Sequence, residues 1–421
     1  MTKSTRVVEA HYDVFPYPTV STLTQPLPSS FKRDYLSFLL RRRREAWLPP
    51  DAKIWVAGCG TQQGTHWALS FPEADVLATD VSESTLGIAT GLASQLGLTN
   101  IRFEKQDLMR PRFQAQFDFI VCTGVLHHLP DPARGLAHLR AALRPGGAAL
   151  VMVYSTMHRE PLAVFRRALD GLTRGGEDVQ SRYDLACRLL DTVLTAELCS
   201  PPCPEALELL RQRCRDDRSF VADALLHPLE VTYDIDGLLD LLRGAGFAHV
   251  SWLHPARWNL AEYLDDPDLL DRFRGLDPVA QWNALYHLAG YSGPLLECLV
   301  EPAEAPQRPP FTMDELLAMS VVCSRGSRRF GVQDGRVVGT MLAPAFEEEG
   351  NELVGRGSGG FDVRWSWRTP AYVQPILDAC DGSRPLGELI DAFADAFDPQ
   401  DLLDLFNEFL PTNLGLLVPR W

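Results

Sequence analysis

The chain has 421 residues, too many for one hydrophobic core of ordinary size, so we expect two or three domains. Hydrophobic residues make up 46% and charged residues 23% of the chain, which excludes a disordered protein. The formal net charge of -15 disfavours general attraction to nucleic acid or to anionic membranes, so we expect neither as a partner.

The apolar runs and the cysteines bear on the cellular location of the protein and on metal binding. The first residues lack an apolar core of signal-peptide length, and no apolar run approaches the ~20 residues of a spanning helix. The nine cysteines have no regular spacing, so we expect free thiols in the cytoplasm. Four of them crowd one region: Cys187, Cys199, Cys203 and Cys214. Neither a second close pair nor a histidine pair completes a zinc ligand set there, so we expect no metal site.

Residues 1–50 precede the first predicted strand and contain "HYDVFPYP" at 11–18. The aromatic side chains of Tyr12, Phe15 and Tyr17 have two readings. They close as a lid over a ligand at the edge of the sheet, or they pack on the sheet as a structural segment. On the first reading Tyr12 and Tyr17 are candidates for contact with the substrate.

Strands and helices alternate between residues 51 and 155. Short apolar runs at 53–57, 75–80, 101–106, 117–122 and 148–154 indicate strands, several of them without strict alternation, as in strands buried on both faces. Helical patterns occupy 82–97 and 132–147 between them. This order predicts a doubly wound α/β fold with a parallel sheet covered by helices.

The alternation stops after residue 155. Residues 156–233 have helical patterns only, which predicts a helical insertion long enough to cap the carboxyl ends of the strands. A helix at 234–247 and strands at 249–254 and 294–301 indicate that the sheet resumes over 234–302.

A Pro-rich linker at 303–312 separates a last unit, 313–421. Its "QDGR" stretch between apolar runs predicts a β-hairpin, and three helical patterns follow. Two small strands with three helices form an α+β unit that resembles a winged helix.

The chemistry is concentrated where the first strands end. In an open parallel sheet, ligands bind at the carboxyl edge near the point where strand order switches. The turn "AGCGTQQG" places Gly58 and Gly60 where a side chain would block close approach, and a helix N-terminus follows. Asp80 ends the second strand, where its carboxylate can accept hydrogen bonds from both hydroxyls of a ribose. Dinucleotide-binding and adenosylmethionine-binding domains share these features.

Three further features separate these two classes. The glycine spacing is G-x-G-x-x-x-G rather than the G-x-G-x-x-G of a dinucleotide site, which disfavours an NAD-dependent oxidoreductase. Asp107 follows the third strand, and "TGVLHHLPDP" and "LRPGG" follow the fourth. Together these residues resemble class I S-adenosylmethionine-dependent methyltransferases. The resemblance implies a seven-stranded Rossmann-like sheet and S-adenosyl-L-methionine as cofactor. The cofactor-binding residues it implies are Ala57, Gly58, Gly60, Thr61, Asp80, Val81, Gln106, Asp107, Leu108, Thr123 and Gly124.

A narrower resemblance rests on "HYDVFPYPTV", "LATDVSESTLGIA" and "LRPGG…VYS". These segments are similar to a bacterial methyltransferase group that includes protein-lysine methyltransferases and members with helical insertions and a C-terminal winged helix. One departure is the missing acidic residue before the first glycine, where Val56 and Ala57 stand. Backbone carbonyls, such as those of Ala57 and Thr123, or a group from elsewhere must then hold the ammonium group of the cofactor.

The candidate catalytic residues are His127, His128 and Tyr154, because they follow strands whose ends face the cofactor's methyl group. The alternative for the two histidines is local packing at a helix start. His227 and Tyr233 lie where the insertion rejoins the sheet, and they either bind the acceptor or form a buried hydrogen-bonded pair.

The last unit resembles PqqD-type peptide-recognition domains through "PILDACDGSRPLGELIDAFADAF". Its alternative is a dimerisation or regulatory module. In the case of a dimerisation module, the protein would form a homodimer. Its acidic helices repel phosphate, which disfavours a DNA-binding role. The sequence therefore predicts methyl transfer to a peptide or protein side chain, with a small metabolite as the alternative acceptor and a non-catalytic scaffold as the lesser alternative.

Overall fold

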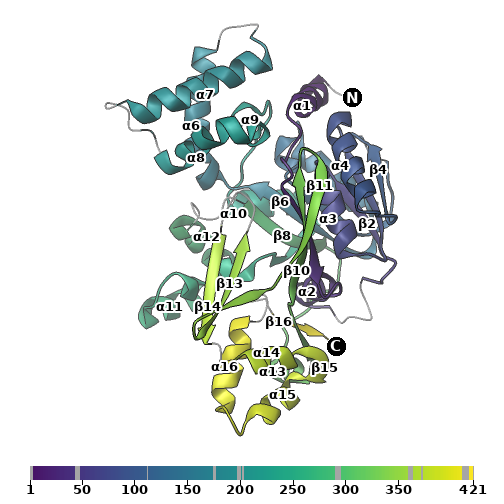
Figure 1. Ribbon diagram of the computed structural model, residues 1–421, viewed down its shortest axis with the longest axis vertical. Coiled ribbons are helices and arrows are strands. Elements are labelled where there is room, and N and C mark those ends of the chain that lie inside the picture. Colours follow the sequence, from purple (N-terminus) through teal and green to yellow (C-terminus); the bar gives the residue numbers. More distant parts are fainter. Residues whose placement is uncertain are drawn as a thin grey trace.

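The computed structural model describes residues 3–42, 48–110, 112–173, 177–196, 201, 203–289, 295–358, 364–370, 373–409 and 417–420. At its centre is a seven-stranded sheet with the order β4-β3-β2-β5-β6-β8-β7 (Figure 1). Its strands are β2 (Lys53–Ala57), β3 (Asp75–Asp80), β4 (Ile101–Lys105), β5 (Phe117–Thr123), β6 (Leu143–Tyr154), β7 (Phe247–Trp252) and β8 (Leu295–Pro302). The prediction of a seven-stranded α/β fold is confirmed.

Strand direction differs in one place from the expected parallel sheet. β8 runs antiparallel to both of its neighbours, β6 and β7. The chain leaves β7, passes through α11 (Pro267–Arg274) and α12 (Pro278–Ala289), and returns beside the strand it left, a connection that needs no crossover. Apolar periodicity identifies a strand but carries no information on its direction.

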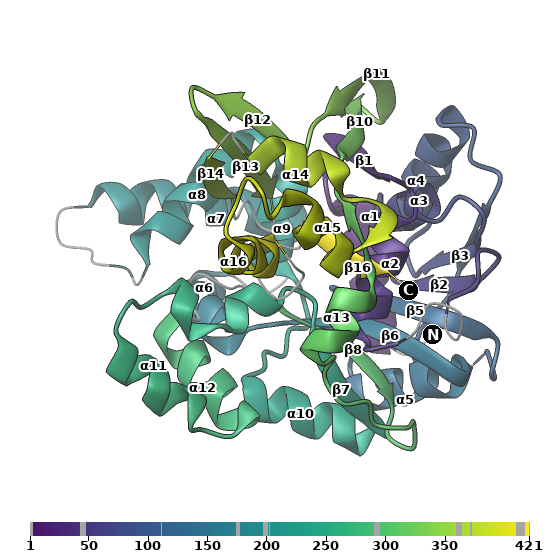
Figure 2. The ribbon, with the colours of Figure 1, turned by 90° about the horizontal axis from the view of Figure 1, so that it is seen from below.

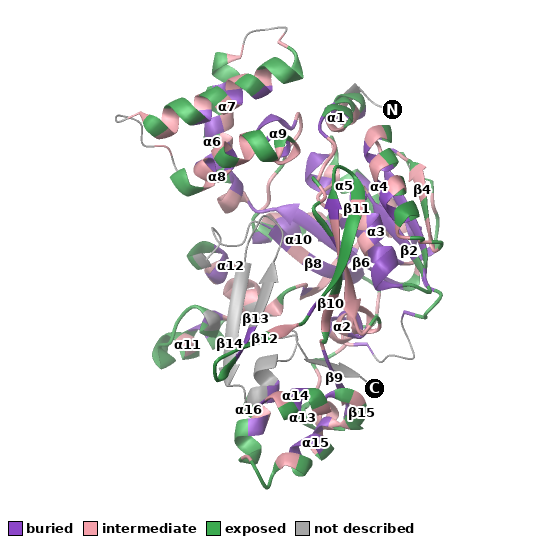
Figure 3. Ribbon diagram, in the orientation of Figure 1, coloured by how far each residue is buried: buried purple, intermediate pink, exposed green. Residues whose placement is uncertain are grey.

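Helices cover both faces of the sheet because its strands are apolar on both sides. Ile54 and Val56 face α2 (Phe31–Leu39), α3 (Gln63–Ser70) and α4 (Glu83–Gln95), whereas Trp55 and Ala57 face α5 (Pro132–Ala142) and α10 (Ile235–Gly244). Figure 3 shows the buried residues concentrated in these layers. Burial of a Val, Leu or Ile side chain contributes about 1.5–3 kcal/mol, so the two cores position the strand ends firmly.

Helix boundaries follow their capping residues. Ser82 accepts a hydrogen bond from Thr85 N to start α4, and Asp131 accepts one from Arg134 N to start α5, with Pro132 at its first position. The helix predicted over 132–147 ends earlier, at Ala142, and the next five residues belong to β6. Gly146 has a φ of 79°, which suits a non-helical backbone.

The segment between β6 and β7 contains α6 (Thr156–Leu172), α7 (Val179–Thr195), α8 (Pro204–Asp216) and α9 (Arg218–Leu226). These helices share their own apolar core, to which Phe15 of the N-terminal segment contributes. They lie at one end of the molecule, next to α1 (Lys3–Val14) (Figure 1). The insertion and the N-terminal segment are therefore packed together.

The described residues of the C-terminal region form three short sheets and four helices. The sheets comprise β9 (Ser320–Cys323), β10 (Gly326–Gln333), β11 (Arg336–Ala343), β12 (Phe346–Glu349), β13 (Glu352–Ser358), β14 (Arg364–Pro370), β15 (Asp381–Pro385), β16 (Leu417–Arg420) and, from the N-terminal segment, β1 (Thr22–Leu27). The helices are α13 (Met313–Ala318), α14 (Gln374–Ala379), α15 (Leu386–Phe393) and α16 (Pro399–Phe409). The last three lie together at the end opposite the insertion (Figures 1 and 2).

The predicted hairpin forms, but with a different partner than the sequence indicated. β10 and β11 pair around Asp334 and Gly335, and β10 also pairs antiparallel with β1. Val332 packs with Leu23 of β1 and Leu92 of α4. The hairpin thus covers the N-terminal segment and the central domain instead of packing with the C-terminal helices. Its apolar side chains pack on apolar side chains of β1 and α4. The winged-helix resemblance stays a prediction.

Candidate active site

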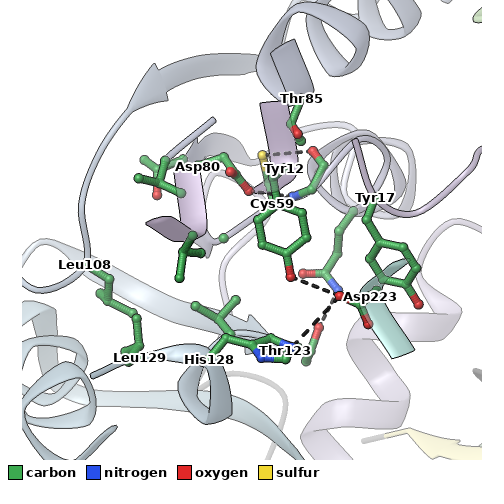
Figure 4. A pocket seen from close by; sticks show the side chains of 18 of the residues that line it. Tyr12, Tyr17, Cys59, Asp80, Thr85, Leu108, Thr123, His128, Leu129 and Asp223 are labelled. Carbon is green, nitrogen blue, oxygen red and sulfur yellow. Dashed lines mark hydrogen bonds and ion pairs between the residues drawn. The ribbon is translucent and has the colours of Figure 1, made fainter. Parts of the chain in front are cut away.

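A pocket of about 1310 Å³, open solvent at its mouth included, lies at the carboxyl ends of β2, β3, β5 and β6. Side chains from the N-terminal segment and from α9 complete its wall (Figure 4). Most of the residues predicted for the cofactor line it: Gly58, Gly60, Asp80, Val81, Gln106, Asp107, Leu108, Thr123 and Gly124. This cavity therefore lies at the predicted edge of the sheet.

The glycine turn after β2 is held by the end of β3. The N–H groups of Gly58 and Cys59 both donate to the carbonyl of Thr79 at 2.8 Å. The φ of Gly58 is 71°, and a Cβ there would lie 2.2 Å from a methyl carbon of Val125. A Cβ at Gly60 would lie 2.8 Å from the carbonyl oxygen of Tyr17. Glycine is thus required at both positions by close protein neighbours, and the turn leaves its backbone open to the pocket.

Asp80 ends β3 with its carboxylate fixed by backbone donors. Its Oδ2 accepts from Gly60 N and its Oδ1 from Ser82 N, both at 3.0 Å. Burial raises the pKa of Asp80 above its ordinary value, against the effect of these hydrogen bonds. A carboxylate oxygen can accept more than one hydrogen bond, so Asp80 can still accept from the hydroxyls of a ribose in the pocket.

Two buried acceptors in the pocket wall lack hydrogen-bond partners among the described residues, although Asp107 Oδ2 lies 4.0 Å from Arg110 Nε. Asp107 Oδ1 accepts from Met109 N at 2.9 Å, but Asp107 Oδ2 and Gln106 Oε1 have no hydrogen-bond partner among the described residues. Buried polar atoms in native proteins are nearly always satisfied, so an unpaired acceptor in a pocket wall indicates a ligand donor. The contact of Asp107 with an adenine amino group stays a prediction, and Asp107 Oδ2 can accept a hydrogen bond from such a donor.

A further unpaired acceptor belongs to Gln63, which the sequence analysis did not select. Its amide nitrogen donates to Thr123 Oγ1, and its Oε1 is buried without a partner among the described residues. Gln63 lines the pocket near the glycine turn. Its amide oxygen fits a positively charged ligand group such as an ammonium.

The other end of the pocket is built around Asp223, which the sequence analysis also missed. Tyr12 Oη donates to Asp223 Oδ1 at 3.1 Å, and Tyr154 Oη donates to Asp223 Oδ2 at 2.9 Å (Figure 4). Asp223 is only 2% exposed and lies on α9 of the insertion. The available signal was one carboxylate inside the apolar helical stretch "SFVADALL". Burial of an aspartate requires such partners.

His128 adds an imidazole to this group. Its Nδ1 lies 2.7 Å from the carbonyl of Leu229, which can only accept, so Nδ1 carries the proton in the neutral ring. Its Nε2 therefore has a free lone pair, 4.0 Å from Asp223 Oδ1. Burial lowers the pKa of His128, although Asp223 opposes this effect. The ring is thus a neutral base at the pocket wall.

The remaining predicted residues lie around the pocket rather than in its wall. His127 is fully buried, and its ring centroid lies 3.8 Å from that of Tyr154. His227 is buried with its ring 3.6 Å from His128, and Tyr233 N donates to the carbonyl of Tyr154 at 2.9 Å. The structure therefore places His128 and Tyr154 in the pocket wall, whereas His127, His227 and Tyr233 pack behind it.

The predicted residues of the N-terminal segment and of the glycine turn also divide into those that line the pocket and those that pack outside it. Tyr12 and Tyr17 line the pocket, and Thr61 N donates to the carbonyl of Tyr17 at 3.1 Å, which holds the N-terminal segment against the glycine turn. Ala57 and Thr61 are buried outside the lining. Phe15 packs on Tyr183 of the insertion. The N-terminal segment thus serves both readings, as a wall of the pocket and as a packed structural element.

Within the described ranges, no group of three or more His, Cys, Asp or Glu side chains is arranged to hold a metal ion. Cys199 lies outside those residues. None of the helices in the same part of the chain combines the length and the apolar character needed to span a membrane.

The fold and the pocket together define a class I, S-adenosylmethionine-dependent methyltransferase. A methyltransferase-domain family model matches residues 55–149. The chain belongs to the family of protein syc1184_c of Synechococcus sp., to which it is 30% identical over 292 residues, 67% of this chain and 68% of that protein. S-adenosyl-L-methionine is the cofactor.

Two further similarities differ in extent. The structure of PKMT2 from Rickettsia typhi, also solved in complex with AdoHcy, has a TM-score of 0.60 at 15% identity, over 96% of this chain and 77% of that one. The ubiquinone biosynthesis O-methyltransferase of Coxiella burnetii is 38% identical over 103 residues, 24% of this chain. The match spans 42% of the length of that enzyme. The first similarity covers the whole architecture and the second covers only part of the chain.

Proposed function

We propose that this protein methylates a side chain of a peptide or protein. The observation that carries the proposal is that the similarity in fold to PKMT2 extends over 96% of the chain, far beyond the methyltransferase domain. The insertion and the C-terminal region are therefore part of the shared architecture. Additional elements of this size suit a large acceptor.

The chain's own residues hold the cofactor in this proposal. Asp80 accepts from the ribose, Asp107 from the adenine amino group and Gln63 Oε1 from the ammonium group. Bound S-adenosylmethionine supplies a methyl group on a positively charged sulfur. The protein must align an acceptor atom with that group and limit access of water, and side chains of α1 and α9 supply walls of the pocket for this.

The group around Asp223 binds and deprotonates the acceptor. The neutral His128 ring can take a proton at Nε2, and the carboxylate of Asp223 at 4.0 Å stabilises the resulting charge. Burial raises the pKa of Tyr154 well above its ordinary value, so its hydroxyl stays a donor and keeps Asp223 oriented. Tyr12 fixes the same carboxylate from the N-terminal segment.

Methylation of a small metabolite is the second candidate. The local identity to the ubiquinone biosynthesis O-methyltransferase of Coxiella burnetii favours it, because that match has the higher sequence identity. The match is confined to 103 residues, 24% of this chain, so it does not account for the additional elements.

Incubation with methyl-labelled S-adenosylmethionine and a lysate from a strain lacking the protein separates the two candidates. We expect label in a protein or peptide fraction, lost with Asp80→Ala and kept with Asp75→Ala at the opposite end of the same strand. Label confined to small molecules would overturn the proposal in favour of a metabolite acceptor. Cofactor binding without any transfer of label would support a scaffold.

A further inference from the structure

Helix α1 separates two cavities. One of its faces, with Thr5, Val8 and Tyr12, lines the cofactor pocket. The adjoining face lines a second cavity through Arg6, Val7, Ala10 and His11. This division follows from helical periodicity, because residues three and four apart share a face. A ligand in the second cavity would therefore contact the helix that also lines the first.

The second cavity lies between α1 and the helical insertion and has a volume of about 1130 Å³, open solvent included. Its opposite wall comes from α7 and from the end of α9, through Val179, Arg182, Leu226 and Pro228. Val7 and Val179 line this cavity and are 47% and 37% exposed, so part of their apolar surface is not covered by protein. The cavity thus has room and an apolar wall for a hydrocarbon group.

The polar groups of this cavity are cationic or neutral. Arg6 has no ion pair among the described residues, and Arg182 pairs with Asp170 at 2.7 Å while its Nε is buried without a partner. His11 is only 4% exposed, and its Nε2 is likewise unpaired among the described residues. In a chain with a formal net charge of -15, two arginines beside an unpaired imidazole are a local exception.

Three of the nearby carboxylates already have partners, whereas Glu177, next to Asp178, has a buried Oε2 without a hydrogen-bond partner among the described residues. Glu9 of α1 pairs with Lys105 at 2.7 Å, and Asp178 caps α7 by accepting from Ser181 N at 2.7 Å. Asp170 is the partner of Arg182. The guanidinium of Arg6 and the unpaired groups of Arg182 and His11 therefore remain for a ligand from solution.

We propose that this cavity binds a small carboxylate with an apolar body. Arg6 and Arg182 bind the carboxylate, His11 donates a further hydrogen bond from Nε2, and the valine and leucine side chains pack on the hydrocarbon. The bound molecule joins α1 to the insertion. By linkage, a ligand that favours this closed arrangement raises the affinity of the cofactor pocket, and the cofactor raises the affinity for the ligand to the same extent.

Hexanoate is a suitable probe for calorimetry with the full chain. We expect saturable binding that Arg6→Gln weakens by about tenfold or more, since hydrogen bonds to charged groups are lost. Arg134→Gln, at an exposed arginine of α5, is the matched control and should bind hexanoate as the unaltered protein does. No saturable binding, or equal binding by both variants, would overturn the proposal.

Two analogues separate the two halves of the ligand. Acetate retains the charge without the apolar body, and 1-hexanol retains the apolar body without the charge, so both should bind more weakly than hexanoate. Equal affinity for either analogue contradicts the assigned ligand class. Thermal unfolding of Arg6→Gln verifies its fold, because an exposed substitution on α1 should leave the melting temperature nearly unchanged.

Coupling is a separate measurement that needs no methyl acceptor. Saturating hexanoate should tighten binding of S-adenosylhomocysteine about fivefold or more in the unaltered protein, and not in Arg6→Gln. Binding of hexanoate without this change would overturn the link between the two cavities. None of these readouts depends on which acceptor the enzyme methylates.

Discussion

The hydroxyl of Tyr154, at the end of β6, donates a 2.9 Å hydrogen bond to the Asp223 carboxylate on α9. This contact joins the central sheet to the helical insertion inside the pocket. Tyr12 donates to the other carboxylate oxygen and joins the N-terminal segment to the same point. Three regions far apart in sequence thus meet at one buried carboxylate in the pocket wall.

Replacement of Asp223 by asparagine should lower kcat by about 100-fold, as expected for loss of general acid–base assistance. Asparagine keeps the shape of the side chain but cannot stabilise a proton on His128. The affinity for S-adenosylhomocysteine should change little, because Asp223 lies away from the residues assigned to the adenosine. Steady-state kinetics and calorimetry measure the two effects. Asp268→Asn, at an exposed position of α11, is the control, and equal kinetics of the two variants would remove Asp223 from the acceptor site.

The two adjacent histidines should differ in their contributions to turnover. His128 lines the pocket with a free Nε2, whereas His127 is fully buried against Tyr154. We expect His128→Gln to lower kcat by about 100-fold in a protein that remains folded. His127→Gln should act mainly on stability, because it disturbs buried packing. A larger kinetic effect at His127 would contradict this assignment and favour a direct role for that ring.

Asp80→Ala should abolish measurable binding of S-adenosylhomocysteine. The substitution removes the expected ribose acceptor and also leaves the Gly60 and Ser82 N–H groups without their partner. Titration calorimetry measures the loss. Asp75→Ala changes the other end of β3, where the carboxylate is about half exposed, and should leave the affinity unaltered. Retained affinity in Asp80→Ala would mean that the cofactor is held elsewhere.

The cofactor end of the pocket could be predicted from sequence because its determinants are local. Gly58, Gly60, Asp80 and Asp107 each follow a strand, and the ends of parallel strands meet at one edge. Asp223 could not be placed in this way. It reaches the pocket from α9 through the packing of the insertion, and no local pattern specifies that orientation.

Pairing between strands far apart in the sequence likewise limits how much of the fold can be predicted. The hairpin turn at Asp334 and Gly335 has a clear local signal, but its pairing with β1 spans about three hundred residues. The direction of β8 could not be predicted either, because the apolar pattern of a buried strand does not depend on the direction in which the strand runs.

Stability should fall as the solution is acidified below neutral pH. Burial lowers the pKa of His11 and of His66 to about 4, from an ordinary value of 6.5. The unfolded chain therefore binds more protons than the folded one between these values. This contribution is complete above pH 6.5 and is lost progressively down to about pH 4.

Urea unfolding at pH 7.5 and pH 5.5 measures this dependence, and the free energy of unfolding should be smaller at the lower pH. The variant His66→Gln removes one contributor, so its difference between the two conditions should be smaller than in the unaltered protein. An unchanged difference would mean that His66 titrates normally in the folded state.

The packing of the hairpin against the central domain can be tested within the hairpin itself. Val332 of β10 is 8% exposed and packs with Leu23 and Leu92, whereas Val338 of β11 is 63% exposed. Val332→Asp buries an unpaired charge and should cost about 3 kcal/mol or more of unfolding free energy, while Val338→Asp should stay within about 0.5 kcal/mol. Thermal and urea unfolding of the full chain compare the two variants.

The signal to follow is tryptophan fluorescence of the central domain, because Trp55 and Trp67 lie in its two cores. If the hairpin covers α4 and β1, Val332→Asp destabilises the transition reported by these residues, and the region beyond the 303–312 linker is not an independent folding unit. Equal transitions in the two variants would place the hairpin away from the central domain and restore the autonomous C-terminal unit that the sequence predicted.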